Sequence, residues 1–172
     1  LKMSNWMKIT SVLQEQNSYP GIATRRLAGS AEKVYLGFDE ARKHITPSAW
    51  MVTTGNPVRR SVLGGDRIDA LNYFGLAGNK KTILVLGGSQ GARSVNQAVI
   101  AGLDSGSLPD GYQLLWQTGK LDHEQIVSSL GGAAQGHRLF AFENRMDLVY
   151  AAADLVIARA GAITLAEIEA CR

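Results

Sequence analysis

An apolar run that ends in a glycine-rich turn constrains this chain more than any other feature. Residues 82–86 read Thr-Ile-Leu-Val-Leu, and residues 87–93 continue as Gly-Gly-Ser-Gln-Gly-Ala-Arg before a helix-like stretch that starts at Ser94. A continuous aliphatic run is typical of a strand buried on both faces of a parallel sheet. Glycines let the backbone turn tightly and approach a ligand. The pattern predicts a strand, a turn and a helix start whose free N–H groups favour a bound diphosphate.

Three other interpretations fit the same turn. Glycine there is also compatible with simple packing of a helix on a strand, which stays open. Gly87–Gly91 matches the G-x-S-x-G nucleophile elbow, but His137 and Asp154 precede apolar runs and would lie at the wrong strand ends for a triad. A dinucleotide site is disfavoured because Leu86 stands where the first glycine belongs, and no acid follows the run 113–116.

Composition narrows the classes of partner. The 172 residues are 45% hydrophobic and 19% charged, which is ordinary for a globular protein. A net charge of +3 is too small to favour nucleic acid, so no nucleic-acid partner is predicted. A single cysteine, Cys171, excludes an internal disulfide. Because the sequence starts without methionine and ends inside a helix-like pattern, we expect it to be part of a longer chain.

Strand-like and helix-like segments alternate along most of the chain. We expect strands at 9–13, 34–37, 82–86, 113–117, 138–142 and 155–157, and helices at 22–31, 39–43, 66–74, from 94, 122–130, 146–153 and 164–170. Residues 46–60, which hold Pro47, Gly55 and Pro57, are predicted to be an extended crossing. Regular alternation of this kind predicts an α/β fold with a doubly wound parallel sheet.

A second cluster, residues 159–167, follows the predicted strand 155–157. It reads Arg-Ala-Gly-Ala-Ile-Thr-Leu-Ala-Glu and would lie at the same sheet edge as Ser89, so one nucleotide could touch both. Thr164-x-x-Glu167 also matches a capping box, in which the glutamate bonds to the N-cap backbone. A carboxylate there is equally suited to accept hydrogen bonds from a ribose diol. Both interpretations of Glu167 stay open.

Six segments, in order, resemble the MurG family of bacterial glycosyltransferases, which add N-acetylglucosamine to a muramyl-pentapeptide lipid carrier. They are Gln14-Glu15-Gln16-Asn17, residues 55–59 (Gly-Asn-Pro-Val-Arg), residues 87–93, Gln117-Thr118-Gly119-Lys120, residues 146–154 and residues 159–167. The sequence departs from the family pattern at Gln14 and at Trp116, two positions where the family often has histidine.

The resemblance implies a GT-B architecture, in which two Rossmann-like domains face a cleft. Residues 1–45 would be the end of the N-terminal acceptor domain, residues 46–60 the crossing between domains, and residues 61–172 most of the C-terminal domain that binds the UDP-sugar. The proposed catalytic base and the glutamine-rich motif that grips the sugar would lie outside these residues. We therefore expect the isolated sequence to be inactive.

The resemblance also implies binding roles for ten residues. For the diphosphate these are Ser89 and Gln90, with Arg59 beside it; for the uracil, Phe142 and the backbone of Glu143; for phosphate and sugar, the backbone of Ala162, Ile163 and Thr164; for the ribose hydroxyls, Glu167; and for the sugar, Asn17. Simpler roles stay open for three of them. Arg59 is compatible with an ordinary surface arginine, Asn17 with a turn residue, and Phe142 with core packing.

The activity implied is inverting transfer of N-acetylglucosamine from its UDP donor. The acceptor would be the undecaprenyl-diphosphate-linked muramyl pentapeptide, at the cytoplasmic face of the bacterial plasma membrane, with peripheral membrane contact made through the missing N-terminal part. No cofactor and no metal are expected, since helix N-termini would stabilise the departing diphosphate. A UDP-N-acetylglucosamine 2-epimerase, another GT-B transferase and an inactive UDP-binding module are the alternatives.

Overall fold

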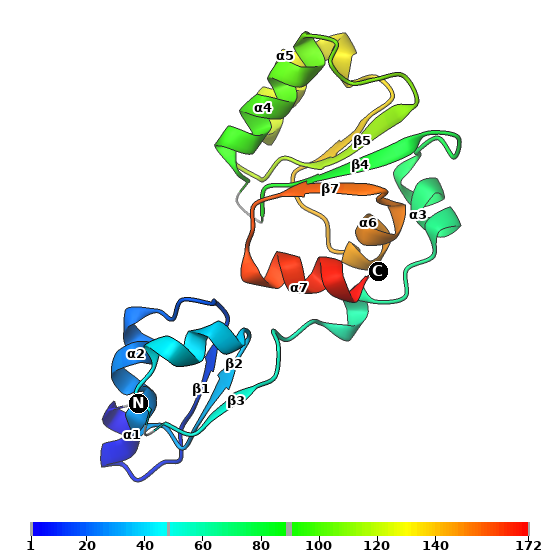
Figure 1. The fold of residues 1–172 in the computed structure, drawn as a ribbon. Helices are drawn as coiled ribbons and strands as arrows, with labels where there is room; N and C mark the ends of the chain where they lie inside the picture. The colour runs from blue at the N-terminus through cyan, green and yellow to red at the C-terminus, as the bar shows by residue number, and fades with distance from the viewer. Residues whose placement is uncertain (1, 48, 89–90, 172) are drawn as a thin grey trace. The chain divides into compact units, whose positions relative to one another are not determined.

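The computed structural model describes residues 2–47, 49–88 and 91–171 (Figure 1). The chain divides into two compact units, with the boundary between Val58 and Arg59, and each unit is described by itself.

The first unit is built on a three-stranded parallel sheet with the order β1-β2-β3. Its strands are β1 (Val12–Glu15), β2 (Lys33–Leu36) and β3 (Met51–Thr53), and its helical segments are α1 (Lys2–Trp6), α2 (Ile22–Leu27), η1 (Ala28–Ser30) and η2 (Asp39–His44). A small core packs on this sheet from Ala28, Val34, Leu36, Ala41, Ile45 and Ala49.

Two predictions for this unit differ from the structure. The first strand begins at Val12, three residues later than predicted. The segment 46–60, predicted as a crossing, contributes strand β3, which pairs with β2 in parallel. Between Pro47 and Gly55, Met51 packs its side chain against the core, and that burial makes the extended backbone a sheet strand.

The second unit holds a four-stranded parallel sheet with the order β6-β5-β4-β7. Its strands are β4 (Lys81–Leu86), β5 (Tyr112–Gln117), β6 (Arg138–Phe140) and β7 (Leu155–Ala158); its helices are α3 (Arg67–Phe74), α4 (Arg93–Asp104), α5 (His123–Leu130), α6 (Met146–Ala152) and α7 (Ala162–Ala170), with short η3 (Arg60–Val62) and η4 (Gly131–Ala134). The predicted α/β class with parallel strands is confirmed. The aliphatic run supplies the inner strand β4, where Leu84 and Val85 are fully buried.

The order of the strands sets which helix covers which face. Helices α4 and α5 cover one face of the sheet, and α3, α6 and α7 cover the other (Figure 1). The chain runs outward from β4 through β5 to β6 and then returns to place β7 on the other side of β4. Because βαβ crossovers share one hand, this reversal moves the connecting helix to the opposite face. The reversal leaves a crevice between the carboxyl ends of β4 and β7.

The face under α4 and α5 is anchored by Trp116 on β5. Its indole is fully buried, and its Nε1–H donates to Asn96 Oδ1 at 3.1 Å. The amide Nδ2 of Asn96 in turn donates to the carbonyl of Thr118 at 2.8 Å. Trp116 is thus a core residue with its polar atom satisfied, a role consistent with its departure from the family pattern.

Candidate functional site

Two adjoining cavities lie at the carboxyl edge of the second sheet. The first has a volume of about 350 Å³ and lies in the crevice between β4 and β7; it is lined by Leu86, Gly87, Gly88, Arg159, Ala160, Gly161 and Thr164. The second has a volume of about 390 Å³ and is lined by Arg59, Leu86, Gly88, Gln117, Phe142, Glu143, Asn144, Met146, Tyr150, Ile163, Thr164 and Glu167. Leu86, Gly88 and Thr164 line both, so the cavities form one continuous site.

Glycine is required in the turn after β4. Gly88 and Gly91 both have a φ of +83°, in the left-handed region that favours glycine. A Cβ on Gly91 would also lie 2.5 Å from the carbonyl oxygen of Thr118, whereas one on Gly88 would meet nothing within 4 Å. Gly91 therefore lets the turn pack against the end of β5, and Gly88 leaves bare backbone facing the cavity.

The start of α7 presents backbone donors to both cavities. Gly161 is the N-cap residue, and among the described side chains none caps this helix end. The first intrahelical bond runs from Leu165 N to Gly161 O, so within the described residues the N–H groups of Ala162, Ile163 and Thr164 are left without an intrahelical acceptor. Such a helix start favours an anion through its free donors and its dipole.

The capping-box interpretation of Glu167 is wrong. Helix α7 begins at Ala162, two residues earlier than predicted, so Thr164 is its third residue and not its N-cap. The carboxylate of Glu167 instead accepts a hydrogen bond from the Tyr150 hydroxyl at Oε2, at 2.9 Å. Its other oxygen, Oε1, lies 3.7 Å from Nη2 of Arg59. Glu167 thus joins α7 to α6, with one oxygen held by tyrosine and the other beside a cation.

The environment of Tyr150 keeps its hydroxyl protonated. Burial raises the pKa of Tyr150, and the hydrogen bond to the Glu167 carboxylate raises this pKa further. Tyr150 is 8% exposed and Glu167 is also 8% exposed. The pair is therefore a buried donor and a buried carboxylate at the rim of a cavity.

An exposed aromatic ring forms the far wall of the second cavity. Phe142 is 43% exposed, so it is not a core residue. It follows β6, which ends at Phe140, two residues earlier than predicted. The Lys120 ammonium lies 5.4 Å from the centre of the ring. Beside it, Glu143 Oε1 accepts hydrogen bonds from the N–H groups of Asn144 and Arg145 at 2.7 and 2.9 Å, which fixes the backbone of this loop.

Gln117 joins the two loops that flank the site. It ends β5, is only 4% exposed, and donates from Nε2 to the carbonyl of Gly88 at 3.1 Å. Its Oε1 accepts from the backbone N–H of Glu143 at 3.4 Å. Gln117 is a site residue that was not predicted from the sequence. The available signal was a polar residue that ends an apolar strand and opens one of the family-like segments.

The structure gathers most of the predicted residues. Those that line the second cavity are Arg59, Phe142, Glu143, Ile163, Thr164 and Glu167. Ala162 is the first residue of α7. Ser89 and Gln90 lie outside the described residues. Besides Gln117, Tyr150 and Met146 line the cavity without having been predicted as site residues.

Asn17 belongs to the first unit and stabilises the turn after β1. Its backbone N–H and its Nδ2 both donate to Glu15 Oε1, at 3.1 and 3.2 Å. Gly21 N donates to the other carboxylate oxygen at 3.0 Å. Burial alone would raise the pKa of Glu15, but the hydrogen bonds from Asn17, Thr24 and Gly21 outweigh it and lower the pKa. These contacts agree with the turn role for Asn17.

Asp154 and His137 lie at the opposite edge of the second sheet. Asp154 precedes β7, where Oδ2 accepts from Arg67 and from the backbone N–H of Thr82, both at 2.8 Å, and Oδ1 from Lys81 at 2.9 Å. Burial would raise the pKa of Asp154, yet these hydrogen bonds outweigh it and lower the pKa to about 2. His137 precedes β6 and accepts at Nδ1 from Leu114 N at 3.3 Å. Neither can complete a triad with the turn after β4.

The described residues contain neither a candidate metal-binding cluster nor a helix that could span a membrane. Over 2–47, 49–88 and 91–171, no three His, Cys, Asp or Glu side chains come together in a way that could hold a metal ion. Within the same ranges, each helix is too short or too polar to cross a bilayer.

A parallel α/β unit with a glycine turn, an open helix start and a cavity where the strand order reverses has the architecture at which α/β proteins commonly bind ligands. The chain belongs to glycosyltransferase family 28, whose C-terminal domain matches residues 82–171. It is a homologue of UDP-N-acetylglucosamine–N-acetylmuramyl-(pentapeptide) pyrophosphoryl-undecaprenol N-acetylglucosamine transferases. The relative from Flavobacterium psychrophilum is 42% identical over 98% of this chain. Those from Bacteroides fragilis and Bacillus pumilus are 42% and 40% identical over 97% and 95% of it.

The chain spans 45% of the length of each of these relatives. The chain also spans 45% of a similar protein whose structure has been solved. The crystal structure of Acinetobacter baumannii MurG matches 97% of this chain and 45% of its own, with a TM-score of 0.64 and 24% identity. This match shows the fold.

Proposed function

We propose that the second unit binds UDP-N-acetylglucosamine and that the protein transfers N-acetylglucosamine to the undecaprenyl-diphosphate-linked muramyl pentapeptide. The observation that carries the proposal is the continuous site at the carboxyl edge. There, free backbone donors of α7 adjoin a buried carboxylate and an exposed aromatic ring. The names of the relatives supply the substrate and the acceptor.

The diphosphate would occupy the first cavity. The N–H groups of Ala162, Ile163 and Thr164 would face it from α7, and the bare backbone of Gly88 would border it from the turn after β4. Fixed donors of this kind stabilise charge that develops on a leaving group, by about 3 kcal/mol per donor in favourable cases. The contacts predicted for Ser89 and Gln90 belong to the same part of the site.

The ribose would bind at Glu167. Glu167 lines the second cavity, and a carboxylate is a strong acceptor for the two hydrogen bonds of a diol. Arg59, whose guanidinium lies 3.7 Å from Oε1 of Glu167 and is mostly exposed, would stand between the carboxylate and the diphosphate. The uracil would lie along Phe142, with the Glu143 backbone at its edge.

The rest of the reaction depends on parts beyond this site. We assign residues 1–45 to the acceptor domain, 46–60 to the crossing and 61–172 to the donor domain, with Asn17 as a sugar contact from the acceptor side. The reaction would invert the configuration of the transferred sugar and take place at the cytoplasmic face of the plasma membrane, with the protein bound peripherally. No residue of this sequence is assigned as the catalytic base.

A transfer assay tests the proposal. The full-length protein that carries these residues is given labelled UDP-N-acetylglucosamine with and without the muramyl-pentapeptide diphospholipid. We expect label in the lipid only when acceptor is present. Glu167→Gln should slow the transfer and Glu169→Gln, an exposed position on the same helix, should not. A new UDP-sugar formed without acceptor would indicate an epimerase instead, and UDP binding without turnover would indicate a binding module.

A further inference from the structure

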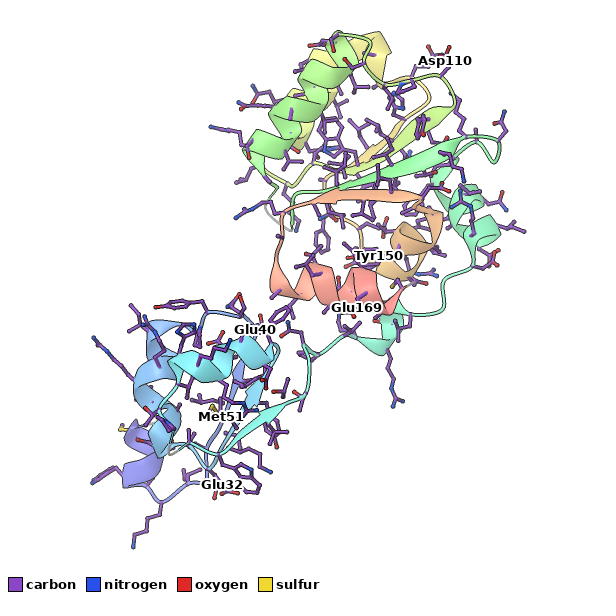
Figure 2. All side chains as sticks on the ribbon, in the orientation of Figure 1. Glu32, Glu40, Met51, Asp110, Tyr150 and Glu169 are labelled. Atoms are coloured by element: carbon purple, nitrogen blue, oxygen red, sulfur yellow. The ribbon has the colours of Figure 1, made fainter. Side chains whose placement is uncertain are left out.

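The hydroxyl of Tyr150 has one described partner, and that partner is the proposed ribose ligand. Tyr150 lies on α6 and Glu167 on the neighbouring α7, with 2.9 Å between the hydroxyl oxygen and Oε2. Figure 2 labels Tyr150 on α6 and Glu169 on α7, so the two helices can be followed there. Both members of the pair are almost completely buried. The contact is therefore shielded from competing water.

A buried glutamate keeps its carboxylate in one orientation only if a donor such as this hydroxyl holds it. Three side-chain torsions separate the carboxylate from the backbone, and a buried carboxylate oxygen without a donor favours rotation or protonation. The tyrosine hydroxyl fixes Oε2 and so fixes which oxygen faces outward. The other oxygen, Oε1, lies beside Arg59, and both Glu167 and Arg59 line the second cavity.

We propose that Tyr150 is a positioning residue, which holds Glu167 with one oxygen turned to the ribose hydroxyls of the bound nucleotide. The inference rests on the proposed function, since it requires that a ribose binds at Glu167. Tyr150 also lines the second cavity, but its hydroxyl is engaged by Glu167. It acts through the carboxylate, so its contribution to binding should exist only for ligands that carry ribose hydroxyls.

The experiment compares two ligands on two matched variants. Tyr150→Phe removes only the hydroxyl, and Tyr112→Phe removes the same group from an exposed position at the start of β5. Affinities for UDP and for 2′,3′-dideoxyuridine diphosphate are measured by calorimetry on the full-length protein. We expect Tyr150→Phe to weaken UDP five- to tenfold and the dideoxy analogue less than twofold. Tyr112→Phe should change neither.

A double variant guards against a general loss of folding. In Tyr150→Phe/Glu167→Gln the neutral amide leaves no buried charge without a donor, and thermal unfolding reports whether each variant is folded. We expect the double variant to bind UDP no more weakly than Glu167→Gln alone. Equal losses for both ligands would mean that Tyr150 only supports packing, and would overturn the inference.

The inference and the proposed function fail in different ways. If Glu167→Gln weakens UDP and Tyr150→Phe does not, the nucleotide site stands and only the role of Tyr150 is refuted. If Glu167→Gln leaves UDP affinity unchanged, the ribose assignment is refuted and the role of Tyr150 with it.

Discussion

The two edges of the second sheet use carboxylates in different ways. At the amino edge, Asp154 has three partners, which are Arg67, Lys81 and the backbone N–H of Thr82, and borders neither of the two site cavities. At the carboxyl edge, Glu167 lines a cavity, and among the described residues it has one short hydrogen bond, from Tyr150, and a longer contact from its second oxygen to Arg59. A carboxylate whose partners are complete stabilises the fold, whereas one with capacity left at a cavity can bind a ligand.

The largest expected effect is a loss of stability at the amino edge of the second sheet. Asp154→Ala should lower the free energy of unfolding by about 3 kcal/mol, because it unpairs two cations and leaves the N–H of the buried Thr82 without its acceptor. Asp147→Ala is a matched control, since its side chain is 18% exposed against 21% for Asp154 but, among the described side chains, it pairs only with Arg145. Denaturant unfolding measures both. A change in UDP affinity with Asp154→Ala would contradict the division between the edges.

At the carboxyl edge we expect a loss of ligand affinity with little change in stability. Glu167→Gln should weaken UDP about 20-fold, close to 1.8 kcal/mol, because hydrogen bonds to an ionised acceptor are about twice as strong as neutral ones. Unfolding should change little, since the amide oxygen still accepts from Tyr150. Calorimetric titration of UDP checks this, with Glu169→Gln as the control on the exposed face of α7. A large loss of stability without loss of affinity would assign Glu167 to the fold.

Acid should remove the stabilisation that ionised Asp154 contributes at the amino edge of the second sheet. Because the folded-state pKa of Asp154 is about 2, against an ordinary value of 3.8, its stabilisation is complete above pH 4 and is lost as the pH falls through 2. The loss should be about 1.5 kcal/mol after allowance for solvent screening. Unfolding of the wild type and of Asp154→Asn is compared between pH 5 and pH 2. The difference between them should shrink over this range, and a constant difference would contradict the assignment.

The smallest effect concerns the exposed aromatic ring. Phe142→Leu should weaken UDP about threefold, near 0.7 kcal/mol, because an aliphatic side chain keeps much of the apolar area but loses the stacking surface. Leu121→Ala, at a strongly exposed position in the loop after β5, is the control. Titration with UDP and with inorganic pyrophosphate separates the base from the phosphates. A loss that is equal for both ligands would place Phe142 outside the base subsite.

Much of the fold follows from sequence because strand β4 is an unbroken aliphatic run with a glycine turn behind it. Parallel strands bring their carboxyl ends together, so the meeting of the turn after Leu86 with residues 159–167 could be predicted as well. Contacts that depend on the direction in which a side chain points could not be predicted from the sequence. Gln117 forms hydrogen bonds with Gly88 and Glu143, which are 29 and 26 residues away in the sequence. Tyr150 on α6 forms a hydrogen bond with Glu167 on α7.

The errors have local causes. The capping box failed because α7 starts at a glycine N-cap without a side-chain acceptor, which the Thr-x-x-Glu pattern does not reveal. Strand β3 was missed because three residues between a proline and a glycine carry little periodic signal. In both places tertiary contacts, and not the local pattern, decide the outcome.

The amide of Gln117 has a thermodynamic consequence for the whole site. It donates to the loop that follows β4 and accepts from the loop that follows β6, so the positions of the two loops are linked through a single side chain. If a bound group holds one loop in the position that the second group requires, it raises the affinity for that second group. Linkage makes this reciprocal, so the nucleoside and the diphosphate would each raise the affinity for the other by the same factor. The nucleotide would thus be recognised cooperatively, as one object and not as two fragments bound independently.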